Sequence, residues 1–244
     1  MDSRGVVLVA GAGGGLGGAI ARAAATDGCS TALGARERNQ RVMQVYGDIS
    51  AHARAAVVRG DVLDRASVQT MVDDTRSALG PIDALVCATG LPVPPGRWLQ
   101  TPWESFETQW NLHVRGTWNL LDAVLPEMVK QKRGIVVLVC SSYARARPPP
   151  NLAPYVTVKF ALRGLAHALA AELTPKGIVV HLVVPSLTET GMTKELPGFI
   201  REAAAGRSPS GALATPADTG LAVAALLRLD QPIFSGNELL VGSD

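Results

Sequence analysis

Three residues in the second half of the chain carry side chains suited to moving a proton: Tyr155, Lys159 and Ser142. Tyr155 and Lys159 are four positions apart, which places them on the same side of a helix. An unaided phenol titrates near pH ~10, and a neighbouring ammonium lowers that value because it favours the phenolate. Such a pair could donate or accept a proton near neutral pH.

A serine precedes this pair at a distance that suits substrate binding. Ser142 follows an apolar run and lies 13 residues before Tyr155, so its hydroxyl could hold a substrate carbonyl against the phenol. Ser141 is adjacent, but neighbouring residues of an extended strand face opposite ways. Only one of the two hydroxyls is therefore expected to point into the site, and the sequence favours Ser142.

A glycine-rich segment near the start of the chain predicts a phosphate-binding turn. Residues 6–10 form an apolar run, and Gly11-Ala12-Gly13-Gly14-Gly15-Leu16-Gly17-Gly18 follows directly. Glycines permit a sharp turn and let backbone N–H groups approach a pyrophosphate, which then rests on the positive end of the next helix. A glycine turn without a ligand is the alternative. Two registers fit: GxxxGxG on Gly11, Gly15 and Gly17, or GxxGxxG on Gly11, Gly14 and Gly17.

The end of the second apolar run favours one dinucleotide over the other. An acidic residue about 20 positions after the glycines would hold a ribose 2′-hydroxyl. Here Ala35 takes that place and Arg36 follows, and a guanidinium can pair with a 2′-phosphate and stack on adenine. We therefore expect NADP(H), with a solvated surface arginine as the alternative. Asp61 could accept from the adenine amino group, although Asp after a strand is also common in turns, and we place Val62 beside it in the cofactor site.

Apolar runs alternate with helical stretches along the chain. This predicts an α/β fold, a doubly wound parallel sheet of the Rossmann type with helices on both faces, as a single domain over residues 1–244. Ligands of such sheets bind beyond the carboxyl ends of the strands, where the strand order reverses. Strands are expected at residues 6–10, 30–34, 55–59, 82–88, 134–140, 178–184 and 238–241, and helices at 16–25, 67–78, 108–130, 155–173 and 218–228.

Residues 187–214 are expected to form a mobile substrate loop. The segment is rich in Thr, Gly, Pro, Ser and Ala, and Gly191 and Gly198 are candidate hinges for closure over a substrate. A surface loop without gating is the alternative. Arg145 and Arg147 could meet an anionic substrate group, although solvated arginines are the simpler reading. Trp98, Trp103, Trp110 and Trp118 could line an apolar pocket or a subunit interface.

Composition, charge and cysteine spacing exclude several other classes of protein. The chain has 244 residues, of which 47% are hydrophobic and 18% charged, so it can close a sizeable core. A net charge of +2 does not favour nucleic acid. Cys29, Cys87 and Cys140 have neither metal-binding nor disulfide spacing, which suggests a reducing compartment. The first apolar run is too short for a signal peptide, and the sequence has no apolar stretch of 18 residues. We therefore expect a cytoplasmic protein with no membrane or metal partner.

Together these motifs resemble the short-chain dehydrogenase/reductase family, in its single-domain branch, over residues 5–243. Residues 191–194 and 235–239 make the chain most similar to the 3-oxoacyl thioester reductases (ketoreductases). The resemblance implies that Tyr155 is the acid/base, that Lys159 tunes it and holds the nicotinamide ribose, and that Ser142 orients the substrate oxygen. It also implies that Thr190 contacts the cofactor and that the protein is a homotetramer. The matching residues are Gly11, Gly15, Leu16, Gly17, Asp61, Ser142, Tyr155, Lys159, Pro185 and Thr190.

Three positions depart from the family pattern. Cys87-Ala88-Thr89-Gly90 replaces Asn-Asn-Ala-Gly, but such cofactor contacts are partly main-chain, so Ala88 and Gly90 stay in the expected cofactor site. Ser186 replaces a glycine after Pro185. His113 stands where the family has a catalytic Asn, while Asn111 would face about 200° around the helix. We hypothesise that His113 holds the water or the lysine of a proton relay; a structural histidine is the alternative.

The expected function is NADPH-dependent reduction of a ketone to a secondary alcohol. The favoured substrate is a 3-oxoacyl thioester or a polyketide-like ketone, free or carrier-bound. One alternative is an NAD(P)⁺-dependent secondary-alcohol dehydrogenase with the same residues. Another is a non-catalytic NADP(H)-binding sensor, against which the intact Ser142, Tyr155 and Lys159 set argues.

Overall fold

Seven strands in the described part of the chain pair side by side, all parallel, in the order β3-β2-β1-β4-β5-β6-β7. The structure is a computed structural model, and it describes residues 4–91, 95–145, 148–190, 193, 198–208 and 210–242. The strand order reverses between β1 and β4, which confirms the doubly wound sheet and sets a ligand crevice at the carboxyl ends of these two strands. The strands are β1 (Val6–Ala10), β2 (Ser30–Ala35), β3 (Ala55–Arg59), β4 (Ile82–Cys87), β5 (Gly134–Val139), β6 (Ile178–Pro185) and β7 (Glu238–Val241).

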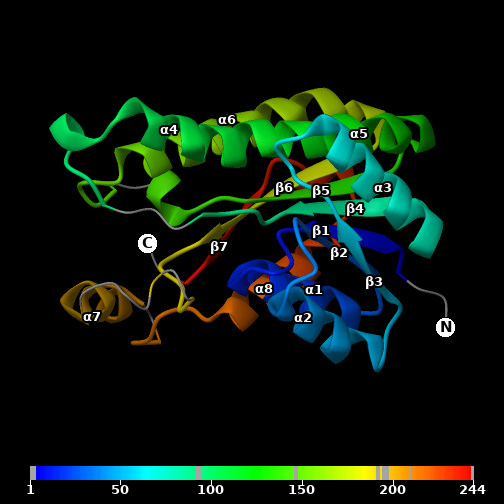
Figure 1. Cartoon of the computed structure of the whole chain (residues 1–244), viewed down its shortest axis with the longest axis horizontal. Helices are drawn as coiled ribbons and strands as arrows, with labels where there is room; N and C mark the ends of the chain where they lie inside the picture. Colours follow the sequence, from blue (N-terminus) through cyan, green and yellow to red (C-terminus); the bar gives the residue numbers. More distant parts are fainter. Residues whose placement is uncertain are drawn as a thin grey trace.

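Helices cover both faces of this sheet. In Figure 1, α3, α4, α5 and α6 lie above the sheet, and α1, α2 and α8 lie below it. A buried apolar cluster fills the space on each side, and β1, β5 and β6 are buried along their whole length, as expected for parallel strands covered twice. The helices are α1 (Gly15–Thr26), α2 (Gln40–Ser50), α3 (Arg65–Leu79), α4 (Trp103–Trp110), α5 (Gly116–Gln131), α6 (Ala153–Leu173), α7 (Gly198–Arg207) and α8 (Pro216–Leu226).

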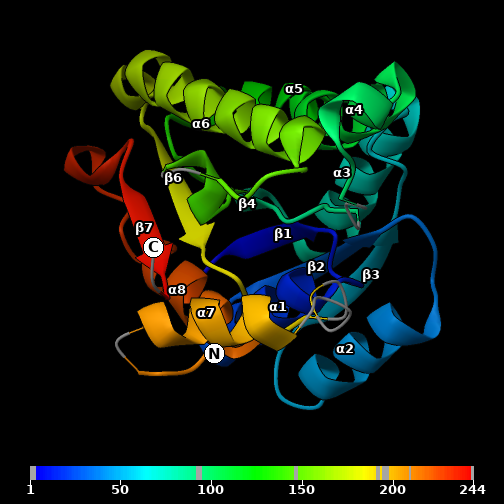
Figure 2. The same cartoon turned by 90° about the vertical axis from the view of Figure 1, so that its left-hand side faces the viewer.

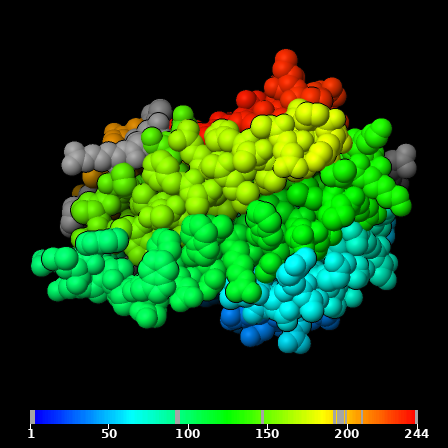
Figure 3. Space-filling view, turned by 90° about the horizontal axis from the view of Figure 1, so that it is seen from above, coloured from blue at the N-terminus to red at the C-terminus, as the bar shows by residue number. Residues whose placement is uncertain are grey.

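One helix differs from the sequence prediction in a way that bears on the site. Residues 108–130 are helical as expected, but the helical run begins earlier, at Trp103, and a π-turn, Asn111–Arg115, divides it into α4 and α5. In this turn the N–H of Gly116 donates to the carbonyl of Asn111, five residues back, so one extra residue is held within the turn. Single π-turns of this kind are frequent at functional sites. In Figure 3, α4, α5 and α6 lie together on the outer face of this layer.

Two further helices were not predicted. Helix α2 begins at Gln40 after Asn39, whose side chain accepts from the N–H of Val42. Helix α7 lies within the expected loop 187–214, and an isolated bridge between Thr188 and Ala214 closes the base of that excursion. In Figure 2, α7 lies across the edge of the sheet from α4 and α6. Of the two expected hinges, Gly198 starts α7 and Gly191 lies outside the described residues.

No helix in the described ranges is long and apolar enough to cross a membrane.

Candidate active site

The glycine turn after β1 is shaped by close backbone packing. Gly11 has φ +89°, and a Cβ there would lie 2.7 Å from the carbonyl oxygen of Ala88, at the end of β4. A Cβ on Gly17 would lie 2.2 Å from the carbonyl oxygen of Gly11. Neither position has room for a side chain. These two glycines, which both sequence registers share, let α1 and the end of β4 approach the turn.

The start of α1 is open to an anion. Gly14 caps the helix without a side-chain hydrogen bond, and the first turn holds no acidic residue. Gly15 is exposed, and the nearest atoms to a Cβ there would be those of the Thr190 side chain, at 3.6 Å. Unpaired N–H groups at a helix N-terminus favour negative charge, so this turn fits a dinucleotide pyrophosphate.

The other predicted cofactor residues line the same edge. The N–H of Ala88 donates to the carbonyl of Ala10 at 2.9 Å, and Gly90, two residues on, is exposed. Leu16 is half-buried in the first turn of α1. The Arg36 side chain, just past the end of β2, is 75% exposed, and its Nε lies 3.9 Å from a Glu37 carboxylate oxygen. It therefore remains accessible from solvent.

The turn after β3 is held partly by its own side chains. One carboxylate oxygen of Asp61 accepts from the N–H of Leu63 at 2.9 Å, which is ordinary turn chemistry. Val62 is buried, and its carbonyl accepts from the side-chain amide of Asn119 at 2.8 Å. The sequence analysis did not single out Asn119. Its contact fixes this turn against α5.

Tyr155 and Lys159 lie in the first two turns of α6, at the carboxyl edge of the sheet. Lys159 is buried, and its Nζ donates to the carbonyl of Val139 at 3.1 Å. The same nitrogen lies 5.5 Å from the centre of the Tyr155 ring. Burial lowers the pKa of Lys159 to about 8. Burial raises the pKa of the Tyr155 phenol to about 12, against the opposing effect of a hydrogen bond with the Ser141 hydroxyl.

In the chain without a cofactor, burial and not Lys159 dominates the pKa of the Tyr155 phenol. The ammonium faces the ring of Tyr155, and its hydrogen bond goes to Val139, so burial dominates the pKa of the phenol. Tyr155 is consequently protonated at neutral pH and poised to give a proton.

A short turn, residues 141–145, brings serine hydroxyls to this pair, and we call it the serine turn. Ser141 caps a 3₁₀ segment, Ser142–Ala144, with its Oγ accepting from the N–H of Tyr143 at 3.3 Å. Ser142 is equally buried, and among the described residues its side chain forms no hydrogen bond. Of the two serines, it is Ser141 that lowers the pKa of the Tyr155 phenol. The alternation argument fails here because β5 ends at Val139, before either serine.

His113 lies beside Lys159. Its ring is buried, its Nδ1 is 3.4 Å from Lys159 Nζ, and its ring centre is 6.0 Å from that of Tyr155. Burial, together with the Lys159 charge, lowers the pKa of His113 to about 2, so the ring is neutral. Nδ1 can then accept from the ammonium, which puts the ring proton on Nε2. Among the described residues, that nitrogen is buried without a hydrogen-bond partner, as is Oε1 of Gln109, one turn earlier.

The sequence comparison decides the family. A model of the short chain dehydrogenase family matches residues 5–199. The chain belongs to this family. It is therefore an oxidoreductase of the short-chain dehydrogenase/reductase class and binds a nicotinamide cofactor.

Similar proteins cover most of the length of this short-chain dehydrogenase. Oxidoreductase UcpA of Salmonella typhimurium (strain LT2) is 28% identical over 243 residues, which cover 96% of this chain and 91% of UcpA. The human mitochondrial dehydrogenase/reductase SDR family member 2 is 33% identical over 196 residues, which cover 79% of this chain and 68% of the human protein. The crystal structure of a 3-ketoacyl-(acyl-carrier-protein) reductase from Brucella melitensis, complexed with NADH, superposes with a TM-score of 0.89 at 27% identity. The superposition covers 98% of this chain and 97% of the reductase.

Other residues of this short-chain dehydrogenase lie differently from expectation. Arg145 does not stand alone at the substrate mouth, because its Nε lies 3.2 Å from a carboxylate oxygen of Glu238. Arg147 falls outside the described residues. The tryptophans do not line a buried pocket within one chain, since each is at least 40% exposed: Trp98, Trp103, Trp110 and Trp118.

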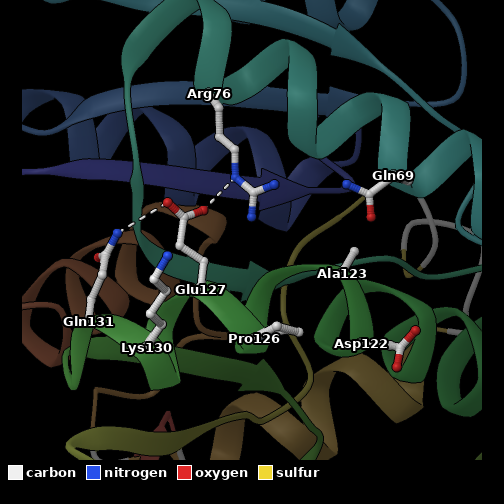
Figure 4. A pocket seen from close by; sticks show the side chains of 8 residues that line it. All are labelled: Gln69, Arg76, Asp122, Ala123, Pro126, Glu127, Lys130 and Gln131. Atoms are coloured by element: carbon white, nitrogen blue, oxygen red, sulfur yellow. Dashed lines mark hydrogen bonds and ion pairs between the residues drawn. The ribbon is translucent and has the colours of Figure 1, made fainter.

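A groove between α3 and α5 lies apart from these catalytic groups. Figure 4 shows Arg76 and Glu127 paired across it, with Nε and Oε2 2.6 Å apart, and Gln131 donating to Glu127. Its α5 residues start at Asp122, nine positions beyond His113. The groove has a volume of about 720 Å³ and is lined by Gln69, Arg76, Asp122, Ala123, Pro126, Glu127, Lys130 and Gln131. A polar groove bridged by its own ion pair is a surface feature of the helix layer.

Proposed function

We propose that this enzyme reduces a ketone to a secondary alcohol with NADPH, and that Tyr155 gives the proton. The observation that carries the proposal is the position of Tyr155 at the carboxyl edge of the sheet, with its ring centre 5.5 Å from Nζ of the buried Lys159. When bound, the cofactor supplies a hydride to the carbonyl carbon. The phenolic proton passes to the oxygen that becomes the alcohol.

The two hydroxyls of the serine turn have different roles. Ser141 holds the phenol in place, and Ser142, whose hydroxyl has no competing bond among the described residues, donates to the substrate oxygen. A donor aimed at an oxygen that gains negative charge stabilises the transition state more than the ground state.

His113 acts behind the lysine. His113 stands at the position where the family has an Asn. Its ring accepts from Lys159 through Nδ1 and so keeps the ammonium next to Tyr155. Lys159 also holds the ribose of the nicotinamide, as the family resemblance implies.

The cofactor lies along the carboxyl edge, with its pyrophosphate over the start of α1. Arg36 binds the 2′-phosphate, which favours NADPH; the exposure of this side chain supports the assignment. The residues that hold the cofactor are Gly11, Gly15, Leu16, Gly17, Arg36, Asp61, Val62, Ala88, Gly90, Tyr155, Lys159 and Thr190.

The favoured substrate class is a 3-oxoacyl thioester or a polyketide-like ketone, free or tethered to a carrier. Likeness to the Brucella melitensis 3-ketoacyl reductase supports this class. Residues 187–214, with α7 in their middle, form the substrate loop of the single domain.

We also propose that this enzyme is a homotetramer and that it is located in the cytoplasm. Exposed aromatic side chains on α4, α5 and α6 support a subunit interface there: Trp110, Trp118 and Phe160. Three separate buried thiols support a reducing compartment: Cys29, Cys87 and Cys140. Sedimentation velocity tests the assembly, and a monomer at micromolar concentration contradicts it.

The reaction is tested by following NADPH oxidation optically against three groups of ketones: 3-oxoacyl thioesters, aromatic polyketones and simple cyclic ketones. We expect turnover with at least one group. Tyr155→Phe should lower kcat by about 10²–10⁴-fold while NADPH affinity changes little. Near-native turnover by Tyr155→Phe refutes the assignment. Turnover only of alcohols with an oxidised cofactor favours the dehydrogenase, and cofactor binding without turnover favours the sensor.

A further inference from the structure

Helix α6 carries two more polar residues in line with its catalytic pair. Tyr155, Lys159, Arg163 and His167 follow one another at steps of four, which places them along one side of the helix. The first two residues reach the proton-transfer site. The last two both reach Glu238, the first residue of β7.

Glu238 gathers three cationic or polar partners from two different elements. Its Oε1 accepts from Arg163 Nε at 2.5 Å and lies 2.9 Å from His167 Nε2, and its Oε2 lies 3.2 Å from Arg145 Nε. The Glu238 side chain is only 10% exposed. Burial opposes its charge, but hydrogen bonds from Arg163 and His167 outweigh that effect and lower the pKa of Glu238. The carboxylate is therefore ionised at neutral pH.

These contacts reach the far end of the serine turn. While its Nε holds Glu238, Arg163 donates through Nη1 to the carbonyl of Ala144 at 3.2 Å. Arg145, the next residue of the turn, pairs with Glu238 directly. The near end of the turn is continuous with β5, and Ser141 binds the N–H of Tyr143 within it. Glu238 thus ties the free end of the turn to the helix that carries Tyr155 and Lys159.

We propose that Glu238 is a positioning residue: through Arg163 and Arg145 it sets where the serine hydroxyls stand relative to the Tyr155 phenol. The inference rests on the proposed function for its kinetic effect, but the placement itself concerns this chain alone. A shift of about 1 Å in such a group can lower the rate by about 10²-fold. Because the glycine turn lies on the other side of the switch between β1 and β4, cofactor affinity should not depend on this brace.

Glu238→Gln and Arg163→Lys test the proposal together. Gln keeps the size of the side chain but removes the charge that two arginines share. Lys keeps the positive charge but lacks the planar fork that reaches both Glu238 and Ala144. Glu172→Gln is the matched control. Glu172 lies on α6, as Arg163 does, and its carboxylate pairs only with the exposed Lys176 among the described residues, at 2.9 Å.

For a ketone found by the panel, we expect both test variants to lower kcat by about 10–100-fold with the dissociation constant of NADPH unchanged. Because the two residues act as one unit, the double variant should lose little more than either single variant. Glu172→Gln should match the wild type. Wild-type kcat in Glu238→Gln overturns the proposal, and so does a parallel loss of kcat, cofactor affinity and thermal stability, which indicates general damage.

A substrate-free measurement separates this proposal from the proposed function. The chain has three tyrosines, of which Tyr143 lies in the serine turn with its ring centre 6.5 Å from that of Tyr155. Fluorotyrosine labelling and ¹⁹F NMR should show the Tyr143 and Tyr155 resonances moving in Glu238→Gln, while that of Tyr46 stays. Unmoved resonances overturn the brace whether or not any ketone is reduced. Moved resonances without ketone turnover keep the brace and refute only the reaction.

Discussion

The two halves of the carboxyl edge are held by different parts of the chain. On the cofactor half, backbone meets backbone: Gly11 lies against Ala88, and Gly17 against Gly11, with no room for a Cβ. On the catalytic half, side chains hold one another or the serine turn: Lys159 with His113, Arg163 with Glu238, and Glu238 with Arg145 of the serine turn. A backbone-built half fails through steric clash, whereas a side-chain-built half fails through lost hydrogen bonds. The two should therefore respond to substitution in distinguishable ways.

The largest effect is expected on the backbone-built half. In Gly17→Ala the new Cβ meets the carbonyl oxygen of Gly11 at 2.2 Å, and two backbone segments cannot both relax. We expect a loss of about 3 kcal/mol or more in the free energy of unfolding, together with loss of NADPH binding. Urea unfolding and cofactor titration measure the two effects.

Gly47→Ala is the control for this clash. Gly47 lies within α2, and a Cβ there would meet nothing within 4 Å. Since alanine favours a helix over glycine, this variant should be more stable by up to about 1 kcal/mol. Equal stability changes in the two variants would contradict the packing argument.

The serine turn gives the next largest effect and separates its two hydroxyls. Ser142→Ala removes the donor to the substrate oxygen, so kcat should fall by about 10²–10³-fold. Ser141→Ala removes a hydroxyl that lowers the pKa of Tyr155, so the loss of kcat should be smaller and the pKa of the phenol should rise. Steady-state kinetics over a range of pH distinguish them. A larger loss in Ser141→Ala would exchange the two roles.

Two buried neutral histidines, His113 and His181, predict that the folded chain loses stability in acid. Burial lowers the pKa of His113 to about 2 and also lowers that of His181, whose Nε2 lies 2.9 Å from the carbonyl oxygen of Leu229. The unfolded chain therefore binds more protons than the folded chain below pH ~6.5. Stability is complete above that pH and falls below it by up to about 1.4 kcal/mol per pH unit for each histidine.

Urea unfolding at several pH values between neutral and mildly acidic checks this slope. His113→Asn should make it shallower, because Asn does not titrate. An unchanged slope in that variant would mean that His113 is protonated within the fold.

The smallest effect is expected at Arg36, which is exposed. Arg36→Ala should reduce the preference for NADPH over NADH by about tenfold, since one charge-assisted contact is lost. Dissociation constants for both cofactors measure the change. An unaltered ratio would assign the 2′-phosphate to another group, with Arg38 as the nearest candidate in sequence.

The same division explains what the sequence could predict. Glycine spacing and β-branched runs are local signals, so the parallel sheet and the turn after β1 follow from them. Helix α2 was missed although its signal is present: Val42, Val45 and Ile49 have helical spacing and are buried, and Asn39 caps the first turn. The choice between Ser141 and Ser142 depends on where β5 ends, and periodicity does not mark strand ends to the residue. Glu238 was invisible as a site residue because its partners lie 71 to 93 positions away.

The π-turn before α5 lets α4 be oriented independently of α5. Deleting one residue from 111–115 would restore ordinary helical spacing and turn α4 by about 100° against α5. Gln109, now buried, and Trp110, now 40% exposed, would change their places relative to α5. His113 lies within the same turn and contacts Lys159, so a one-residue change in length would move the outer aromatic surface and the proton-transfer site together.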